Sequence, residues 1–129
     1  MKKIEKTYTR TGGKWLHIEC DEIIVEALNE ASSMHTTYIG SEHVLLAILK
    51  NTAYPITKVL NGYGVQYETI KNELYFYEEE QIYNGYSPII KEILCTCTNS
   101  TEMILHFLSR EDCVASILLK QYKIKAVLH

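Results

Sequence analysis

Proline and glycine are scarce in this sequence of 129 residues, which contains 2 Pro and 6 Gly. So few turn-forming residues exclude a loop-rich sandwich and leave room for long helices. The sequence also lacks an apolar stretch of the ~20 residues that a membrane-spanning helix needs. Lysines near the N-terminus are not followed by an apolar segment, so no secretory signal is recognised. We therefore expect a cytoplasmic protein that does not associate with membranes.

Long basic runs are missing as well. The formal net charge is −3, and because nucleic acids are bound by clustered Lys and Arg, we do not expect a nucleic-acid partner. A small basic group between Lys2 and Lys14 predicts a solvated N-terminal arm. Hydrophobic residues, in contrast, make up 47% of the chain, which at this length predicts a folded protein with a packed core.

The cysteines and histidines show no metal-binding pattern. Four Cys are irregularly spaced and, without an export signal, are expected to be free thiols. On a helix, Cys95 and Cys97 would point about 200° apart, which makes a poor chelate. His35, His43 and His106 lack the paired spacing of metal ligands, and His43 is expected to be a packed or capping residue. We expect no metal, no cofactor and no catalytic residue.

Apolar residues recur with helical periodicity in several segments. The first predicted helix begins at Asp21, and Ser41 and Pro55 suit the starts of the next two. The fourth runs from about Tyr67 to Tyr77, and another begins at Ser87-Pro88. The side chains expected to face the core include Ile23, Ile24, Ala27, Leu28, Ala31 and Met34 in the first helix and Ile56, Val59 and Leu60 in the third.

The second half of the sequence repeats the first. Thr101-Glu102 resembles Ser41-Glu42, at an interval of 60 residues, and the apolar residues that follow keep this interval. After a one-residue shortening, the segment 118–124 aligns with the segment 59–65. Chance alignment of two amphipathic helices is the alternative, but the shared cap-and-acid entry favours an internal duplication.

These patterns predict an all-α fold of about seven or eight helices in two helical repeats. Residues 1–16 form an arm or hairpin, and residues 17–129 form a single domain. Repeat one spans 17–80 and repeat two spans 86–129, with a polar connector between them that is too central to be a domain linker.

A family resemblance rests on the run from Tyr38 to Leu49. Its sequence, YIGSEHVLLAIL, resembles the Gly-Thr-Glu-His run and following Leu-rich helix of the Clp N-terminal domain family. The segment 59–65 is similar to the family's Val-Leu-x-x-Leu-Gly-Val, and Tyr86-Ser87-Pro88 is similar to the Tyr/Phe-Thr-Pro that opens its second repeat. The resemblance implies two four-helix repeats related by a pseudo-two-fold axis. The second repeat is degenerate: about ten residues are missing between its first two helices, and its last helix is a stub or absent.

The resemblance also implies a ligand. Domains of this family dock adaptors and substrates of Clp unfoldases, and some bind phosphoarginine, with a Glu on the guanidinium and a Thr beside the phosphate. The matching residues are Glu42 and Glu102 for the guanidinium and Ser87 for the phosphate, whereas His17 departs from the Thr of repeat one. The alternative is that Glu42 and Glu102 only stabilise their helices as first-turn acids.

Protein recognition is therefore the expected function. The partner would be a substrate peptide, an adaptor, or the Clp unfoldase or peptidase itself; the oligomeric state is not predicted. The sequence has no phosphate-binding loop of the Gly-x-x-x-x-Gly-Lys-Ser/Thr type, so it is no unfoldase. Two alternatives remain: a fold reused as an enzyme or ligand-binding protein, with Cys113 or the histidines at work, and a component of a peptide-modification or toxin system.

Overall fold

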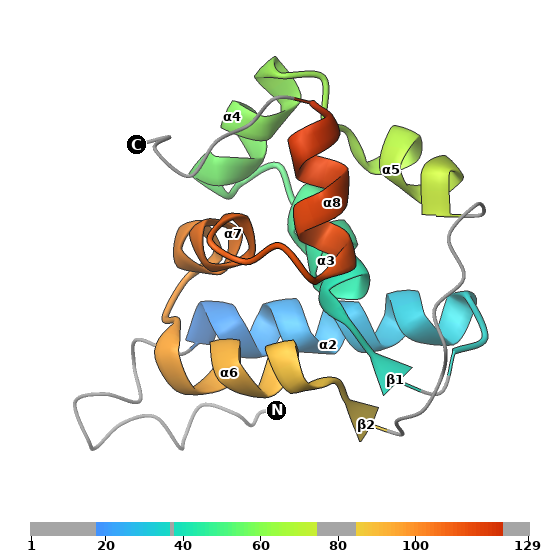
Figure 1. Ribbon diagram of the computed structural model, residues 1–129, viewed down its shortest axis with the longest axis vertical. Coiled ribbons are helices and arrows are strands. Elements are labelled where there is room, and N and C mark those ends of the chain that lie inside the picture. The colour runs from blue at the N-terminus through green and yellow to red at the C-terminus, as the bar shows by residue number, and fades with distance from the viewer. Residues whose placement is uncertain (1–17, 37, 75–84, 123–129) are drawn as a thin grey trace.

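The computed structural model describes residues 18–36, 38–74 and 85–122, and over these ranges the predicted all-α class is confirmed (Figure 1). The N-terminal arm, His17, the end of the fourth predicted helix and residues 123–129 lie outside the described residues, and the domain boundaries stay a prediction. The elements are α2 (Ile18–Ser33), β1 (Tyr38–Ile39), α3 (Ser41–Lys50), α4 (Pro55–Gly62), α5 (Tyr67–Glu73), β2 (Gly85–Tyr86), α6 (Pro88–Thr96), α7 (Ser100–Leu108) and α8 (Val114–Gln121).

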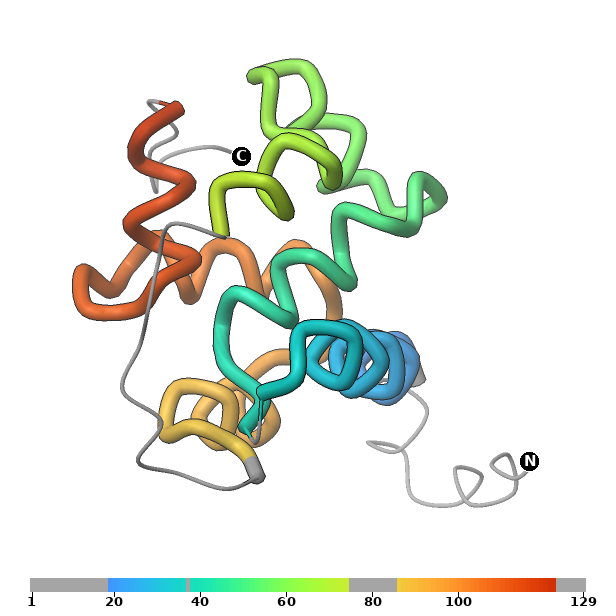
Figure 2. Tube along the Cα trace, turned by 90° about the vertical axis from the view of Figure 1, so that its right-hand side faces the viewer, coloured from blue at the N-terminus to red at the C-terminus, as the bar shows by residue number. Residues whose placement is uncertain are grey.

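Helix α3 is the central helix of the fold. Every residue from Ser41 to Leu49 is buried, because α3 packs against α2, α4, α5, α7 and α8. Figure 2 shows α2 and α6 side by side at one end of the molecule, with α4 and α5 at the other. The buried apolar side chains of both halves form one continuous cluster, as the sequence predicted for a single core.

The helices of the two halves match at a constant interval of 59 residues. Helices α3 and α7 begin at Ser41 and Ser100, and α4 and α8, each of 8 residues, begin at Pro55 and Val114. Their packing is reciprocal, because α3 contacts α8 while its counterpart α7 contacts α4. Such an exchange of contacts is what a two-fold relation between repeats produces.

This interval corrects the predicted register of α7. The sequence suggested an interval of 60, with Thr101-Glu102 as the counterpart of Ser41-Glu42, but α7 begins one residue earlier, after the N-cap Asn99. The counterpart of Glu42 is therefore Thr101, and the counterpart of Glu102 is His43. The apolar pattern did not reveal the slip because nearly every residue of α3 is buried, so neighbouring registers look alike.

Other helix starts were predicted with mixed success. Pro55 and Pro88 do open α4 and α6, where a missing N–H costs nothing. Helix α2, however, starts at Ile18 rather than Asp21, and α3 is capped by Gly40 rather than Ser41. The entry helix of the second repeat is much shorter than that of the first, 9 residues in α6 against 16 in α2, in line with the predicted shortening.

Two residues expected in the core are exposed. Leu28 on α2 and Val59 on α4 keep 49% and 41% of their surface. Both lie at the edge of an apolar stripe, and periodicity gives the direction of that stripe but not the width that neighbouring helices cover. The remaining predicted core residues of α2 and α4 are buried or packed against the core.

A short parallel strand pair joins the two repeats in front of α3. Tyr38 pairs with Gly85 and Ile39 with Tyr86, and the N–H of Ser87 donates to the carbonyl of Ile39 at 2.9 Å. The pair carries Ser87, at the start of α6, to the N-terminal end of α3. In the described part of the chain, no helix is long and apolar enough to cross a membrane.

Candidate ligand-binding pocket

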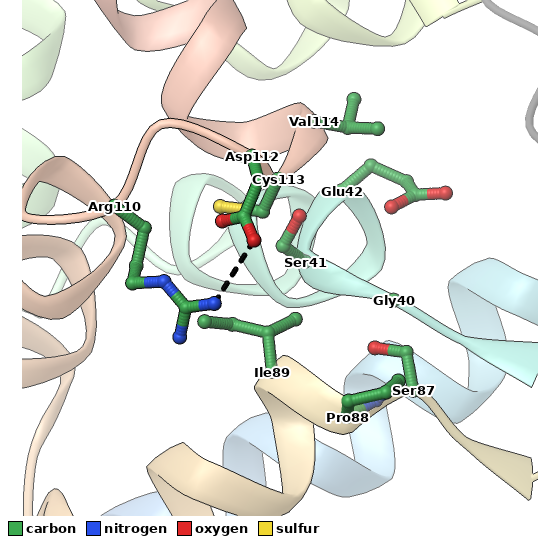
Figure 3. Close-up of a pocket in the computed structure, with 10 residues that line it drawn as sticks. All are labelled: Gly40, Ser41, Glu42, Ser87, Pro88, Ile89, Arg110, Asp112, Cys113 and Val114. Carbon is green, nitrogen blue, oxygen red and sulfur yellow. Dashed lines mark hydrogen bonds and ion pairs between the residues drawn. The ribbon is translucent and has the colours of Figure 1, made fainter.

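Three helix N-termini meet at one pocket of about 140 Å³ (Figure 3). They belong to α3, α6 and α8, so both repeats contribute. Because unpaired backbone N–H groups and the helix dipole make an N-terminus electropositive, this convergence favours a negatively charged group. The lining residues are Gly40, Ser41, Glu42, Ser87, Pro88, Ile89, Arg110, Asp112, Cys113 and Val114.

Glu42 is a buried carboxyl group in the first turn of α3, with 5% of its surface exposed. Its Oε2 accepts a hydrogen bond of 2.6 Å from the Tyr38 hydroxyl. Its Oε1 is buried and finds no hydrogen-bond partner among the described residues. Burial raises the pKa of Glu42, and the bond from Tyr38 only partly offsets that effect. The pocket therefore holds a carboxyl oxygen that a donor from outside would satisfy.

Gly40 is required by the position of this carboxyl group. A Cβ at residue 40 would lie 2.6 Å from Glu42 Oε1 and 2.9 Å from the Tyr38 ring. These distances are below van der Waals contact, so any larger residue would displace the carboxyl group. The Gly-x-Glu spacing thus serves close approach, and the N-cap of α3 lacks a side-chain acceptor as a consequence.

Ser87 contributes the second unsatisfied group. It is the N-cap of α6, yet its hydroxyl makes no capping bond. The hydroxyl is buried and, like Glu42 Oε1, has no partner within the described residues. The first turn of α6 carries no acidic residue, so nothing in that turn balances the dipole of this helix.

Arg110 is the basic side chain that lines the pocket, and its charge is already compensated. One guanidinium nitrogen donates to Glu92 and another donates to Asp112 at 3.0 Å. In Figure 3 Arg110 and Glu42 lie on opposite sides of the drawn residues. The bond from Arg110 lowers the pKa of Asp112. Arg110 therefore anchors the loop between α7 and α8 to α6, and the site is bipolar rather than basic.

Cys113 is the N-cap of α8 and lines the pocket, but its environment does not activate it. Burial raises the pKa of the thiol, outweighing the hydrogen bonds from Ser116 and Ser41 that favour the thiolate. A reactive cysteine needs the opposite shift. The Ser41 hydroxyl itself accepts a 3.0 Å bond from the N–H of Ala115, which joins α3 to α8 under the pocket floor.

His43 is the capping residue that the sequence suggested. Its Nδ1 accepts a 2.9 Å hydrogen bond from the N–H of Gly40, and its ring is fully buried. Burial lowers its pKa to about 4, so the imidazole is neutral near pH 7. A neutral ring whose Nδ1 lone pair is taken has little capacity to act as a general base.

The structure brings together only part of the predicted site. Glu42 and Ser87 line one pocket, whereas Glu102 lies elsewhere and accepts bonds from the N–H and hydroxyl of Thr98 at 2.7 and 3.0 Å. His17 lies outside the described residues. Sequence reasoning missed Arg110, Asp112 and Cys113, and the available signal was the start of α8, since Val114 opens that helix 59 residues after Pro55.

Comparison with known proteins gives one match. Within the described residues, no group of three or more His, Cys, Asp or Glu is placed to hold a metal ion. No curated protein and no solved structure matches the chain. The family model of the Clp repeat (R) N-terminal domain matches residues 18–88, which is more than half of the 129 residues and ends where α6 begins. The chain thus belongs to the Clp repeat N-terminal domain family.

Proposed function

We propose that this chain is a protein-recognition module that takes one side chain of a polypeptide partner, a phosphoarginine, into the pocket between its two repeats. The pocket is smaller than the ~300–1,000 Å³ typical of small-molecule sites, which favours a side-chain head group over a metabolite. No catalytic step is assigned to it.

The single observation that carries the proposal is a pair of buried, unpartnered polar atoms, Glu42 Oε1 and Ser87 Oγ, on one pocket. Leaving such atoms unpaired costs roughly 1–3 kcal/mol each, which a ligand that bonds to both would recover. A guanidinium supplies planar donors for the carboxylate, and a phosphoryl group suits the hydroxyl and the free N-terminus of α6. A phosphorylated arginine has both groups in one head.

The test is a titration of free phosphoarginine into the protein, followed by backbone amide shifts. We expect saturable shifts at the N-termini of α3, α6 and α8, with weaker binding of arginine or inorganic phosphate alone. Glu42→Gln keeps an acceptor for Tyr38 but removes the charge, and Ser87→Ala removes the hydroxyl. Each should weaken binding at least about tenfold, which corresponds to 1.4 kcal/mol.

Glu102→Gln is the matched control, because Glu102 has the same predicted role but bonds to Thr98 outside the pocket. We expect unchanged affinity in this variant. Absence of shifts at the three N-termini, or equal loss of binding in the Glu102 variant, would rule out the phosphoarginine proposal.

The identity of the partner is a finer part of the proposal. Substrates, adaptors and the Clp unfoldase or peptidase all remain candidates, and a cytoplasmic location stays a prediction. A pull-down with the wild type and Glu42→Gln separates them. Clp subunits recovered equally with both proteins would point to docking on the machine through another surface, whereas clients lost with Glu42→Gln would point to substrate capture.

A further inference from the structure

We infer that the chain has only one such ligand position, because the position related to it by the internal repeat is closed by the chain's own Glu19 and Tyr54. This inference rests on the proposed function. It starts from the 59-residue interval, which maps the α3 and α8 ends of the pocket onto the starts of α7 and α4. The second position therefore lies where Asn99, Ser100 and Tyr54 stand.

Glu19 occupies the anion-favouring end of the second position. Its Oε2 accepts a 2.7 Å hydrogen bond from the N–H of Ser100, the first residue of α7. The equivalent residue of α3 is Ser41, which lines the open pocket. A carboxylate on a helix N-terminus makes the charge-assisted contact that a phosphoryl ligand would make, so the protein supplies its own anion here.

Tyr54 fills the corresponding space. It is the N-cap of α4, as Cys113 is the N-cap of α8, and it is 8% exposed. A phenol ring occupies far more volume than a thiol, and protein interiors leave few voids. Burial raises the pKa of Tyr54 to about 12, and the charges of Glu22 and Glu19 add to the shift, which places these carboxylates near the ring.

The second position also lacks a carboxyl group for a guanidinium. Thr101 is the counterpart of Glu42, and the neighbouring Glu102 turns back to bond with Thr98. Three differences thus act together: the anion place is filled, the space is filled and the cation partner is missing. A chain with one open position cannot engage two marks on one partner, so it gains no avidity from a doubly marked segment.

The experiment compares wild type with Glu19→Ala, using phosphoarginine for stoichiometry by calorimetry and inorganic phosphate for amide shifts. Wild type should bind one phosphoarginine, and Glu42→Gln should remove that binding rather than leave half of it. Phosphate should leave the Ser100 amide unmoved in wild type but shift it saturably in Glu19→Ala. The matched control is Glu22→Ala, which removes a nearby acid of α2 and should not free the Ser100 amide.

The outcomes separate the two ideas. Two phosphoarginines per wild-type chain, or a Ser100 amide that phosphate does not reach in Glu19→Ala, would overturn the inference. A Ser100 shift gained in Glu19→Ala without any wild-type binding at the open pocket would support closure by Glu19 and defeat the proposed function instead. If Glu19→Ala does not fold, Glu19→Gln keeps the side-chain length without the charge and should give a smaller shift of the same amide.

Discussion

The two repeats share their inner helices and differ at their edges. Helices α3 and α4 have close counterparts in α7 and α8, with equal or nearly equal lengths and reciprocal packing. The entry helices differ, because α2 has 16 residues and α6 has 9, and so do the N-caps, Gly40 before α3 and Asn99 before α7. The shared helices make the core, whereas the differing edges decide which helix ends stay open.

The difference teaches that a duplicated scaffold need not duplicate its site. At the open pocket a glycine lets the Glu42 carboxyl approach, and Cys113 leaves space. At the related position an asparagine caps α7 with its own side chain, and Tyr54 fills the space. A few substitutions at helix ends therefore separate a binding site from a structural joint, with the core unaffected.

The largest effect is expected from truncating matched core residues of the two repeats. Ile48 in α3 and Phe107 in α7 are counterparts, and both are fully buried. Ile48→Ala should cost about 2–5 kcal/mol of unfolding free energy and Phe107→Ala about 3–5 kcal/mol, since each leaves a cavity. Denaturant unfolding followed by circular dichroism and by tyrosine fluorescence should show one transition in each variant, shifted to lower denaturant.

A single transition follows from the shared core, because buried side chains of both repeats belong to one cluster. Two separated transitions in Phe107→Ala, with repeat one still folded, would show that the repeats are independent units. The exposed Val59→Ala is the matched control and should change stability by less than about 0.5 kcal/mol.

The sequence predicted the inner helices well because their signals are local. Pro55 and Pro88 fix helix starts, and burial of residues such as Ile23 follows from periodicity within one helix. The exposure of Leu28 was missed because it depends on which helix lies beside α2, a tertiary fact that a periodic pattern does not contain. The parallel pair of β1 and β2 was missed because strands of two residues have no periodicity.

The candidate site was predicted in part for the same reason. Glu42 and Ser87 each belong to a local motif, so the sequence identified them without showing that they share a pocket. Arg110 and Asp112 belong to a loop with no motif of its own, and only the packing of α8 against α3 brings that loop to the site. Glu102 was misassigned because the apolar pattern of α7 tolerates a one-residue slip.

The next effect is a pH dependence confined to the cap of α3. Burial lowers the pKa of His43 to about 4 from its ordinary value of 6.5. The unfolded chain therefore takes up a proton below about pH 6.5 that the folded protein takes up only near pH 4. Stability contributed by His43 is full above pH 6.5 and is lost as the pH falls toward 4, by about 2 kcal/mol between pH 7 and pH 5.

His43→Gln isolates this contribution, because glutamine still accepts from the Gly40 N–H but does not titrate. Unfolding free energies of wild type and variant, measured at pH 7 and pH 5, should converge by about 2 kcal/mol at the lower pH. The counterpart Glu102→Gln should show no such convergence over this range. Parallel pH profiles for wild type and His43→Gln would contradict a buried neutral imidazole.

A buried ion cluster stabilises repeat one through α2 and α5. Glu30, 2% exposed, accepts bonds of 2.9 Å from Lys71 and 2.8 Å from the Tyr67 hydroxyl. Burial alone would raise the pKa of Glu30, but the bonds from Lys71 and Tyr67 outweigh it and the pKa is lowered. Lys71→Met should therefore cost about 1–2 kcal/mol near pH 7, with Tyr67 and Lys50 still in place.

The sign of the pH effect follows from the lowered pKa. The Glu30 contribution is complete above its ordinary pKa of 4.5 and is lost as the pH falls through the lowered folded-state value. The difference between wild type and Lys71→Met, measured by denaturant unfolding, should thus shrink below pH 4.5. Lys91→Met on α6, an exposed lysine of repeat two, is the control and should be near neutral. A difference independent of pH would assign the Lys71 effect to packing of its aliphatic stem.

The smallest effect decides the register of α7, on which the comparison of the two repeats depends. Asn99 Oδ1 accepts a 2.9 Å bond from the N–H of Glu102, so Asn99→Ala should cost about 1 kcal/mol, whereas Asn99→Gly, which copies the glycine cap of α3, should cost only a few tenths. An interval of 60 would instead make Thr101 the cap, and Thr101→Ala would then carry the loss. Chemical denaturation of the three variants distinguishes the two registers, and because none of these side chains lines the open pocket, phosphoarginine affinity should stay unchanged in all three. A loss of stability in Thr101→Ala with none in Asn99→Ala would restore Glu102 as the counterpart of Glu42 and remove the structural reason for a single ligand position.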